Sequence, residues 1–327
     1  MAESTMPMAA RSVAALSPGD VERVRAAINS SSAPNTRKNY RSQWAMFERW
    51  AAARQVDALP ADPELVAAYL AELAATHKLA SVGVARAAIG KAHELAGLEN
   101  PTTRPIVRQT MRGIARQIGG PQHQARPLDR PALAAIVATA MKPRLSYGRV
   151  LETDGRAELR GLVDIALART MFDGLLRISE AAALVWADIS RHPDGTGRLT
   201  VRRSKTDPEG AGAVLYLSGE TMAALDAIRP GDSEDSDSVR QGASSIFGLS
   251  AGHMATRINQ AARAAGLGDG FTGHSPRVGM ALELARANIE LPAIMQAGRW
   301  QSPDMPARYI RNESAGRGAV ARLYRRR

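Results

Sequence analysis

The sequence has no cysteine among its 327 residues. Disulfide bonds, thiolate metal sites and a cysteine nucleophile are therefore excluded, and the absence fits a reducing cytoplasm. Aromatic residues make up only 4% of the chain, so the core must be built mainly from Ala, Leu, Ile, Val and Met. The sequence also contains no run of about 20 apolar residues, the length that a membrane-spanning helix needs.

Two common routes to phosphate chemistry are also missing. No His, Asp and Glu cluster with metal-ligand spacing occurs, which disfavours a metal-dependent nuclease. No G-x-x-x-x-G-K-[ST] loop occurs, so ATP is not expected. We therefore expect a protein that works without a metal ion, ATP or any other cofactor.

Positive charge is what the chain has in excess. The net charge is +11 and the isoelectric point is about 10.6. Such a balance favours a polyanion such as DNA as the partner. The alternative is a basic protein without such a partner.

The length suggests two domains. The segment Gly119-Gly120-Pro121 cannot continue a helix, so we place the boundary there. The predicted organisation is a loose tail at 1–17, a helical domain at 18–118, a linker at 119–127 and a second domain at 128–327.

Helical periodicity in the first domain places basic residues on three helices, at 35–56, 79–98 and 104–118. We expect these residues to contact DNA: Arg37, Lys38, Arg41, Arg86, Lys91, Arg104, Arg108, Arg112 and Arg116. The last four repeat every four residues, and no acid lies between Thr103 and Arg126. Solvated helix faces usually mix signs, so this stripe of arginines favours a face that follows phosphates over an ordinary solvated face.

The second domain is predicted to be mainly helical with one small sheet. Alternating residues indicate strands at 198–202 and 213–217, and 186–190 is expected to add a third. Ser179 is a candidate cap for a short helix ending near 185, and a tail helix is expected at 315–324. The acidic loop at 231–238 should face away from any DNA, because phosphates would repel it.

Six residues of the second domain suit metal-free phosphoryl transfer: Arg177, Lys205, His274, Arg277, Trp300 and Tyr309. Charge grows on the non-bridging phosphate oxygens, so fixed cationic donors must meet it, and arginine can bind two oxygens at once. The reaction also needs a nucleophile placed in line and a proton donor for the leaving oxygen.

Each of these residues also has a structural interpretation. The arginine at 177 can pair with Glu180, three residues later, and the lysine can be an ordinary surface residue on a turn between strands. His274 and Arg277 can both be solvated. Trp300 and Tyr309 can belong to the core. A tyrosine with a pKa near 10 is a poor nucleophile unless cations flank it or a base takes its proton.

Four segments together carry a more specific signal. They are LLRISE at 175–180, RSKT at 203–206, GHSPRVG at 273–279, and IMQAGRW at 294–300 followed by YIRN at 309–312. In this order they resemble the motifs of the tyrosine recombinase (phage integrase) family. The resemblance is strong over the second domain and weak over the first.

The resemblance implies a fold and a set of roles. The fold would be an N-terminal helical core-binding (SAM-like) bundle followed by a tyrosine-recombinase catalytic domain. Arg177, His274 and Arg277 would hold the scissile phosphate, and Trp300 would donate to one of its oxygens.

The same resemblance implies how the reaction proceeds. Tyr309 would form a 3′-phosphotyrosyl link, which keeps the bond energy for religation. Lys205 would protonate the leaving 5′ oxygen, and Glu180 would support the site. The sequence departs from the family pattern at Pro276, where many members have leucine, and at Arg299, where related sequences favour glycine. Arg299 would either bind DNA or lie in solvent.

The function implied is site-specific DNA recombination through a Holliday junction. The protein would be a monomer off DNA and a homotetramer on two sites with inverted repeats, in a bacterial, plasmid or phage setting. The tail would dock in a neighbouring subunit or pack on its own domain. A type IB topoisomerase and a DNA-binding regulator with a degenerate site are the alternatives. The target sequence and the choice between integration, excision and dimer resolution stay open.

Overall fold

The computed structural model describes residues 34–120, 124–145, 150–202, 212–230 and 243–317, together with residues 17, 19–20, 22–23 and 323–324. The chain divides into two compact units, Met1–Gln122 and His123–Arg327, which we describe one at a time. Most of the expected N-terminal tail, and the acidic loop at 231–238, lie outside the described residues.

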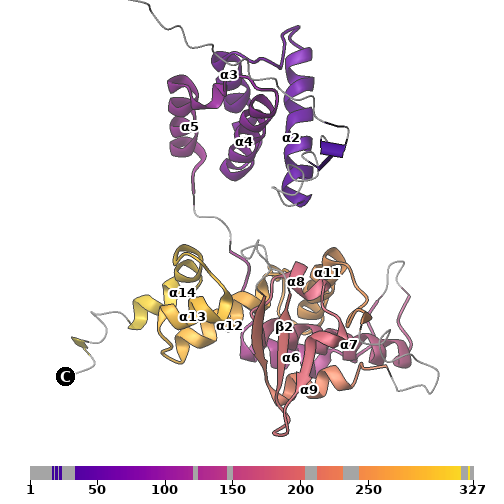
Figure 1. Ribbon diagram of the computed structural model, residues 1–327. Helices are drawn as coiled ribbons and strands as arrows, with labels where there is room; N and C mark the ends of the chain where they lie inside the picture. The colour runs from indigo at the N-terminus through magenta and orange to yellow at the C-terminus, as the bar shows by residue number, and fades with distance from the viewer. Residues whose placement is uncertain are drawn as a thin grey trace, which may run out of the picture. The chain divides into compact units, whose positions relative to one another are not determined.

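The first unit is a bundle of helices (Figure 1). Its elements are α2 (Pro34–Ala52), α3 (Pro63–Ala74), α4 (Leu79–Leu95), the short 3₁₀ helix η1 (Pro101–Thr103) and α5 (Pro105–Ile118). Proline begins several of these helices, where the missing N–H costs nothing and the fixed φ suits the first turn. Helix α2 packs on α4 and α3 packs on α5.

Apolar side chains from all four α-helices fill the core of this unit, among them Phe47, Leu70, Val82, Ile89, Val107 and Ile114. A fully buried histidine, His93, joins the loop before α3 to this core. Its Nε2 accepts from the Ala61 N–H at 2.9 Å, so the ring proton is on Nδ1 and is donated to the Ile89 carbonyl at 2.8 Å. Both ring nitrogens are thereby satisfied, as burial requires.

The second unit is mostly helical. Its helices are α6 (Arg130–Thr139), α7 (Asp154–Asp173), α8 (Ile178–Ala182), α9 (Gly219–Asp226), α11 (Ala251–Ala264), α12 (Ser275–Arg286), α13 (Leu291–Gly298) and α14 (Asp304–Arg317). Helix α7 lies near the centre, since α6, α8, α9, α11 and α12 all pack against it (Figure 1).

The predicted three-stranded antiparallel sheet is confirmed. Its strands are β1 (Ile189–Arg191), β2 (Gly197–Val201) and β3 (Ala213–Leu217), in that order. Alternate residues of β2 are buried and exposed, as a sheet with one covered face requires. The first strand is shorter than predicted because Trp186–Asp188 forms a 3₁₀ helix, in which Asp188 accepts from the Val185 N–H at 3.0 Å.

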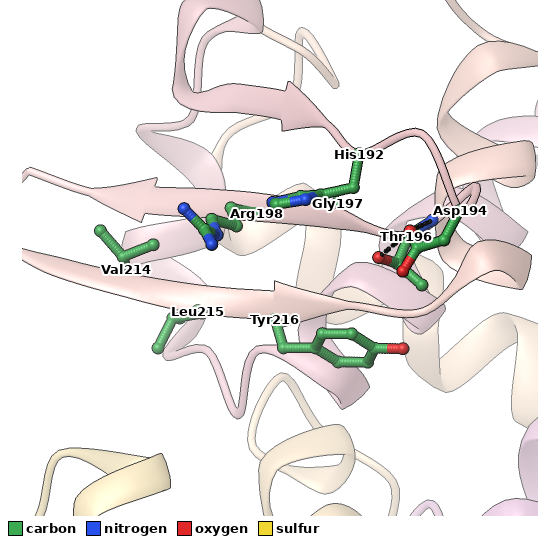
Figure 2. Close-up of a pocket in the computed structure, with 8 residues that line it drawn as sticks. All are labelled: His192, Asp194, Thr196, Gly197, Arg198, Val214, Leu215 and Tyr216. Carbon is green, nitrogen blue, oxygen red and sulfur yellow. Dashed lines mark hydrogen bonds between the residues drawn. The ribbon is translucent and has the colours of Figure 1, made fainter.

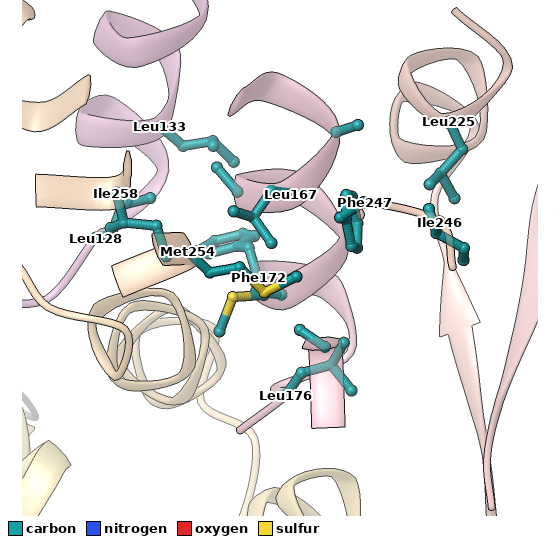
Figure 3. Close-up of a cluster of buried hydrophobic side chains, with 14 of the residues drawn as sticks. Leu128, Leu133, Leu167, Phe172, Leu176, Leu225, Ile246, Phe247, Met254 and Ile258 are labelled. Carbon is teal, nitrogen blue, oxygen red and sulfur yellow. The ribbon is translucent and has the colours of Figure 1, made fainter. Parts of the chain in front are cut away.

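The main core of the second unit surrounds α7, as Figure 3 shows. Leu167 and Phe172 of α7 pack with Leu133 of α6, and with Met254 and Ile258 of α11. The sheet contributes Leu199 and Leu217 to the same cluster. As expected from the composition, aliphatic side chains and methionine make up most of it.

A buried carboxylate also ties α7 to its neighbours. Asp164 is 3% exposed and accepts from Arg144 at 2.9 Å, from Arg160 at 3.2 Å and from Arg257 of α11 at 2.6 Å. Such a charge is tolerated inside a protein only when partners surround it, and loss of one partner is costly. Glu152 adds a second acid through its ion pair with Arg160 at 2.8 Å.

Two local predictions were wrong. Ser179 does not cap α8, because Arg177 occupies the N-cap position and the Glu180 carboxylate accepts from its backbone N–H. The predicted break between a helix ending at 311 and a tail helix beginning at 315 is also absent. Helix α14 continues to Arg317, and of the rest of the tail only residues 323–324 are described.

Replacement of Gly279 tests the packing of α12 on the start of the second unit. An added Cβ would lie 1.9 Å from the Leu128 carbonyl oxygen, which belongs to rigid backbone. We expect Gly279→Ala to lower the free energy of unfolding by roughly 1–3 kcal/mol, the cost of overpacking. Urea denaturation measures it. In Gly252→Ala the nearest atom is Ser250 Oγ at 3.9 Å, so this control should unfold like the parent.

Candidate active site

The site forms around an unusual turn between α7 and α8. Leu175 has a φ of 44°, a conformation that costs a residue with a Cβ about 1–3 kcal/mol and persists only when its surroundings enforce it. The turn directs the Leu175 carbonyl towards two arginines from the far end of the chain. Arg277 donates to this oxygen through Nη1, and Arg299 donates through Nη2 at 3.3 Å.

Arg177 follows this turn and is held by Glu180. Its Nη1 donates to Glu180 Oε1 at 2.7 Å, and its backbone N–H donates to Oε2 at 3.0 Å. The side chain of Glu180 is only 2% exposed, whereas that of Arg177 is 15% exposed. The carboxylate therefore lies beneath the guanidinium and orients it from the protein side.

Arg277 is the most deeply placed cation of the site, at 1% exposure. Its Nη2 donates to the Gly298 carbonyl at 2.5 Å, and its Cζ lies 4.2 Å from the centroid of the Trp300 ring. Burial first, and then the charges of Arg177 and Arg299, lower its pKa to about 9, which still leaves it charged at neutral pH. Two of its five N–H groups donate to carbonyls.

Trp300 connects Arg277 to Tyr309. The indole and phenol rings meet edge to face, with centroids 5.9 Å apart. The indole also lies against the last turn of α13, where a Cβ on Gly298 would come within 1.8 Å of the ring. Glycine at 298 is therefore required for the indole to occupy this position.

Tyr309 lies on α14 in a small apolar cluster with Leu175, Val278 and Ile294, and is 9% exposed. Burial raises the pKa of its phenol, while Arg277, Arg308 and Arg177 act in the opposite direction. The phenol is therefore protonated at neutral pH. It must lose its proton as it reacts.

His274 precedes α12, three residues before Arg277, and keeps part of its surface exposed while the rest lies against the protein. Its pKa is lowered, first by partial burial and then by the charges of Arg277 and Arg177, with Glu180 opposing. The imidazole is consequently neutral at physiological pH. A neutral imidazole can accept a proton or donate one hydrogen bond to an oxygen.

Arg299 belongs to the same cluster, which the sequence did not indicate. The expectation that its side chain lies in solvent was wrong, since this side chain is 11% exposed and is held by protein groups. Its Nη2 donates to Glu180 Oε2 at 2.7 Å and its Nη1 donates to the Gly174 carbonyl at 3.1 Å. Its backbone is left-handed, with φ 57° and ψ 44°, which explains why glycine is the favoured residue at such a helix end.

The structure thus brings six of the predicted catalytic-site residues into one region: Arg177, Glu180, His274, Arg277, Trp300 and Tyr309. Three of them lie on α8, α12 and α14, and the others directly precede α8 and α12 or follow α13. Lys205 lies in 203–211, between β2 and β3, outside the described residues.

The basic residues predicted to contact DNA lie on α2, α4 and α5 of the first unit, except Arg104, which immediately precedes α5. One arginine of the stripe has a partner outside it, because Arg104 pairs with Glu99 at 2.9 Å. Arg108, Arg112 and Arg116 are exposed, and the described part of the chain gives them no ion pair. On α4, Lys91 pairs with Glu94 at 3.4 Å.

Other features of the second unit are separate from the arginine cluster. The outer face of the sheet has a shallow hollow of about 300 Å³ between Arg198, Val214 and Tyr216, seen in Figure 2. It includes none of the predicted catalytic-site residues. Within the described ranges, no three or more His, Cys, Asp or Glu residues gather as metal ligands would, and no helix is long and apolar enough to cross a membrane.

Comparison with known proteins agrees with this geometry. Residues 150–315 match the phage integrase family. The chain is 28% identical to the integrase/recombinase XerD homolog of Selenomonas ruminantium over 315 residues, which cover 91% of this chain and 87% of the relative. It is also 28% identical to the Cre recombinase of Escherichia phage P1 over 288 residues, 81% of this chain and 80% of Cre.

Solved structures show the same fold. A lambda integrase dimer bound to a COC′ core site aligns with a TM-score of 0.55 and 18% identity, over 88% of this chain and 93% of that one. The XerH recombinase bound to difH aligns with a TM-score of 0.56 and 13% identity, over 81% of this chain and 73% of that one.

The match over half of the chain establishes that this protein belongs to the phage integrase family. Members of this family are tyrosine site-specific recombinases, enzymes that cleave and rejoin DNA. The resemblance of the motifs to this family is confirmed, and the XerD homolog and Cre match at equal identity. The topoisomerase and regulator alternatives are not favoured.

The lowered pKa of His274 predicts how stability changes with pH. Near pH 6.5, the ordinary pKa of histidine, the unfolded chain binds more protons at this residue than the folded chain does. The free energy of unfolding should therefore fall as the pH drops from about 6.5 towards the folded pKa. Urea titrations of the parent and of His274→Asn at about pH 7.5 and pH 5.5 measure this slope. An equal slope in both proteins would contradict the prediction.

Proposed function

We propose that the protein cuts and rejoins DNA through a covalent bond between the Tyr309 phenolic oxygen and a 3′ phosphate. The observation that carries this proposal is the placement of Tyr309 beside Trp300, which in turn lies against the buried guanidinium of Arg277. A core tyrosine needs no such neighbours. A nucleophile attacking a phosphate does, because the negative charge that develops must be met by fixed donors.

The scissile phosphate binds above Arg177, Arg277 and His274, with the Trp300 indole N–H donating to one oxygen. The arginines of the cluster, at 177, 277 and 299, exceed its one acid, Glu180, by two positive charges. This surplus favours a phosphodiester, which carries one negative charge and gains more on the non-bridging oxygens during attack. Arginine suits the role because it stays charged and binds two oxygens together.

The reaction requires two proton movements. The Tyr309 oxygen forms a bond to phosphorus as its proton leaves, and neutral His274 is the group in the cluster able to receive that proton. The bond from phosphorus to the 5′ oxygen breaks, and Lys205 gives this oxygen a proton. Religation reverses both movements, so the bond energy is retained and no metal or ATP enters the cycle.

The first unit, as a core-binding domain, holds the same duplex. Its support is the row of exposed arginines at 108, 112 and 116 on α5, with Arg37, Lys38, Arg41 and Arg86 as further candidates. Phosphate contacts of this kind position a protein on DNA without reading sequence. The catalytic domain then meets a defined phosphate.

The working assembly is a tetramer on two DNA sites, each an inverted repeat, that exchanges strands through a Holliday junction. One relative of the same fold, lambda integrase, has been solved as a tetramer bound to a Holliday junction, with 20% identity and a TM-score of 0.56. The C-terminal tail, expected from the sequence at about 315–324, docks in a neighbouring subunit. The protein acts in the cytoplasm of a bacterial host.

Covalent trapping tests the proposal. DNA flanking the coding region is fragmented, fragments that the protein retains are recovered, and a duplex carrying that site is nicked near the cleavage point so that religation fails. In EDTA the parent should form an adduct that survives denaturing electrophoresis. Tyr309→Phe should form none, because it lacks the attacking oxygen. An adduct with Tyr309→Phe would refute the assignment.

Two intact sites on one plasmid distinguish recombination from relaxation. A recombinase produces deletion or inversion between the sites. A type IB topoisomerase would only relax the supercoils. Relaxation without recombinant product would contradict the proposed function while leaving Tyr309 as the nucleophile.

The salt dependence of binding tests the arginine row. Arg112→Gln and Arg116→Gln should each weaken binding to specific and unrelated DNA alike, and each should reduce the slope of log K against log salt by about 1. Arg54→Gln is a control with the same change of charge, since Arg54 is already paired with Glu72 at 2.7 Å and stacked on Trp50. Unchanged salt slopes in both test variants would remove the row from the interface.

A further inference from the structure

Arg299 stands out among the charged residues near the site because its contacts join two segments far apart in the chain. Its guanidinium reaches Glu180 Oε2 at 2.7 Å, the Gly174 carbonyl at 3.1 Å and the Leu175 carbonyl at 3.3 Å. Gly174 and Leu175 belong to the α7–α8 turn and Glu180 to α8, whereas Arg299 itself lies between α13 and Trp300. One side chain therefore connects the segment that presents Arg177 to the segment that presents Trp300.

The backbone of Arg299 is left-handed, which is unfavourable for a residue with a side chain. A left-handed residue after a helix is where glycine is favoured, because a Cβ is strained there. Here a long side chain occupies the position, and it is turned into the protein and almost completely buried. The contacts with Glu180 and the two carbonyls offset this strain.

The contact with Glu180 has an electrostatic consequence for Arg177. Glu180 gives Oε1 to the Arg177 guanidinium, while Oε2 accepts from Arg299 and from the Arg177 backbone N–H. Without Arg299 the whole negative charge of the carboxylate would face Arg177. A cation already neutralised by a close carboxylate attracts a phosphate less strongly.

We propose that Arg299 is a positioning residue that shares Glu180 with Arg177 and fixes the α7–α8 turn against Trp300. This inference rests on the proposed function. Arg299 need not touch DNA, and it acts through groups that do. Its loss leaves Arg177 more strongly held by Glu180 and leaves the Gly174 carbonyl without the bond that Arg299 donates.

Arg299→Gly is the most informative variant. It removes the guanidinium and at the same time relieves the left-handed strain, so the fold should be retained. We expect its thermal midpoint to stay near that of the parent and its affinity for the site to fall less than its cleavage rate. At saturating protein, single-turnover cleavage of the nicked duplex should slow roughly 10- to 100-fold, as for other groups that orient a reactive residue.

Two further variants separate positioning from general support. Arg299→Lys should restore part of the rate, because an ammonium can pair with Glu180 but cannot also span both carbonyls. In a Glu180→Gln background the effect of Arg299→Gly should shrink, since the carboxylate through which it acts is gone. A purely structural role would give neither the rescue nor the coupling.

Arg257→Met is the matched control. Arg257 also pairs with a buried carboxylate and a carbonyl, Asp164 at 2.6 Å and Arg160 O at 2.7 Å, but away from Tyr309. The Arg257→Met variant should have a lower thermal midpoint than the parent, and the cleavage rate of the folded protein should be unchanged.

The outcomes are distinct. Cleavage by Arg299→Gly at the parental rate would overturn the inference and leave the proposed function standing. A loss of affinity with a normal rate at saturation would overturn it too, because Arg299 would then bind DNA directly. If the parent itself forms no adduct, the proposed function fails and this inference falls with it.

Discussion

The burial of one positive charge organises the catalytic unit. Arg277 is 1% exposed, and a guanidinium at such depth is tolerated only when hydrogen-bond acceptors surround it. Two acceptors are main-chain carbonyls, those of Leu175 and Gly298, and an indole covers one face. Leu175 must adopt a left-handed backbone to present its oxygen, and residue 298 must be glycine to admit the indole. The demands of a single side chain thus shape the turn after α7 and the end of α13.

Around Arg277, the charge or protonation state of each site residue depends on its neighbours. Glu180 orients Arg177 but would also neutralise it, and Arg299 takes part of that carboxylate. The cations hold the pKa of His274 down, while burial keeps the phenol of Tyr309 protonated until it reacts. An unliganded site with surplus positive charge is electrostatically strained. An arriving phosphate relieves that strain, which couples DNA binding to assembly of the reactive arrangement.

Much of this architecture was predictable from the sequence, and for identifiable reasons. The strands at 197–201 and 213–217 alternate, and the helix at 105–118 has an apolar stripe, so periodicity located both. The site residues were found because the four motifs, and their order, can be read directly from the sequence. The left-handed turn at Leu175 was not predictable, since leucine carries no signal for it. Residue spacing also does not encode three contacts that only the folded chain makes. They are the Arg104–Glu99 ion pair, the cap that Glu180 provides for α8, and the burial of the Arg299 side chain against Glu180.

Arg277 donates to main-chain carbonyls, and this affects how the site tolerates substitutions. A side-chain acceptor can be deleted by one base change, but a backbone carbonyl is present whatever residue occupies the position. Substitutions at 175 can alter how the oxygen is aimed but cannot remove it. Drift in the surrounding sequence therefore changes the rate of such a site gradually. Loss of the arginine itself would instead remove the charge in a single step.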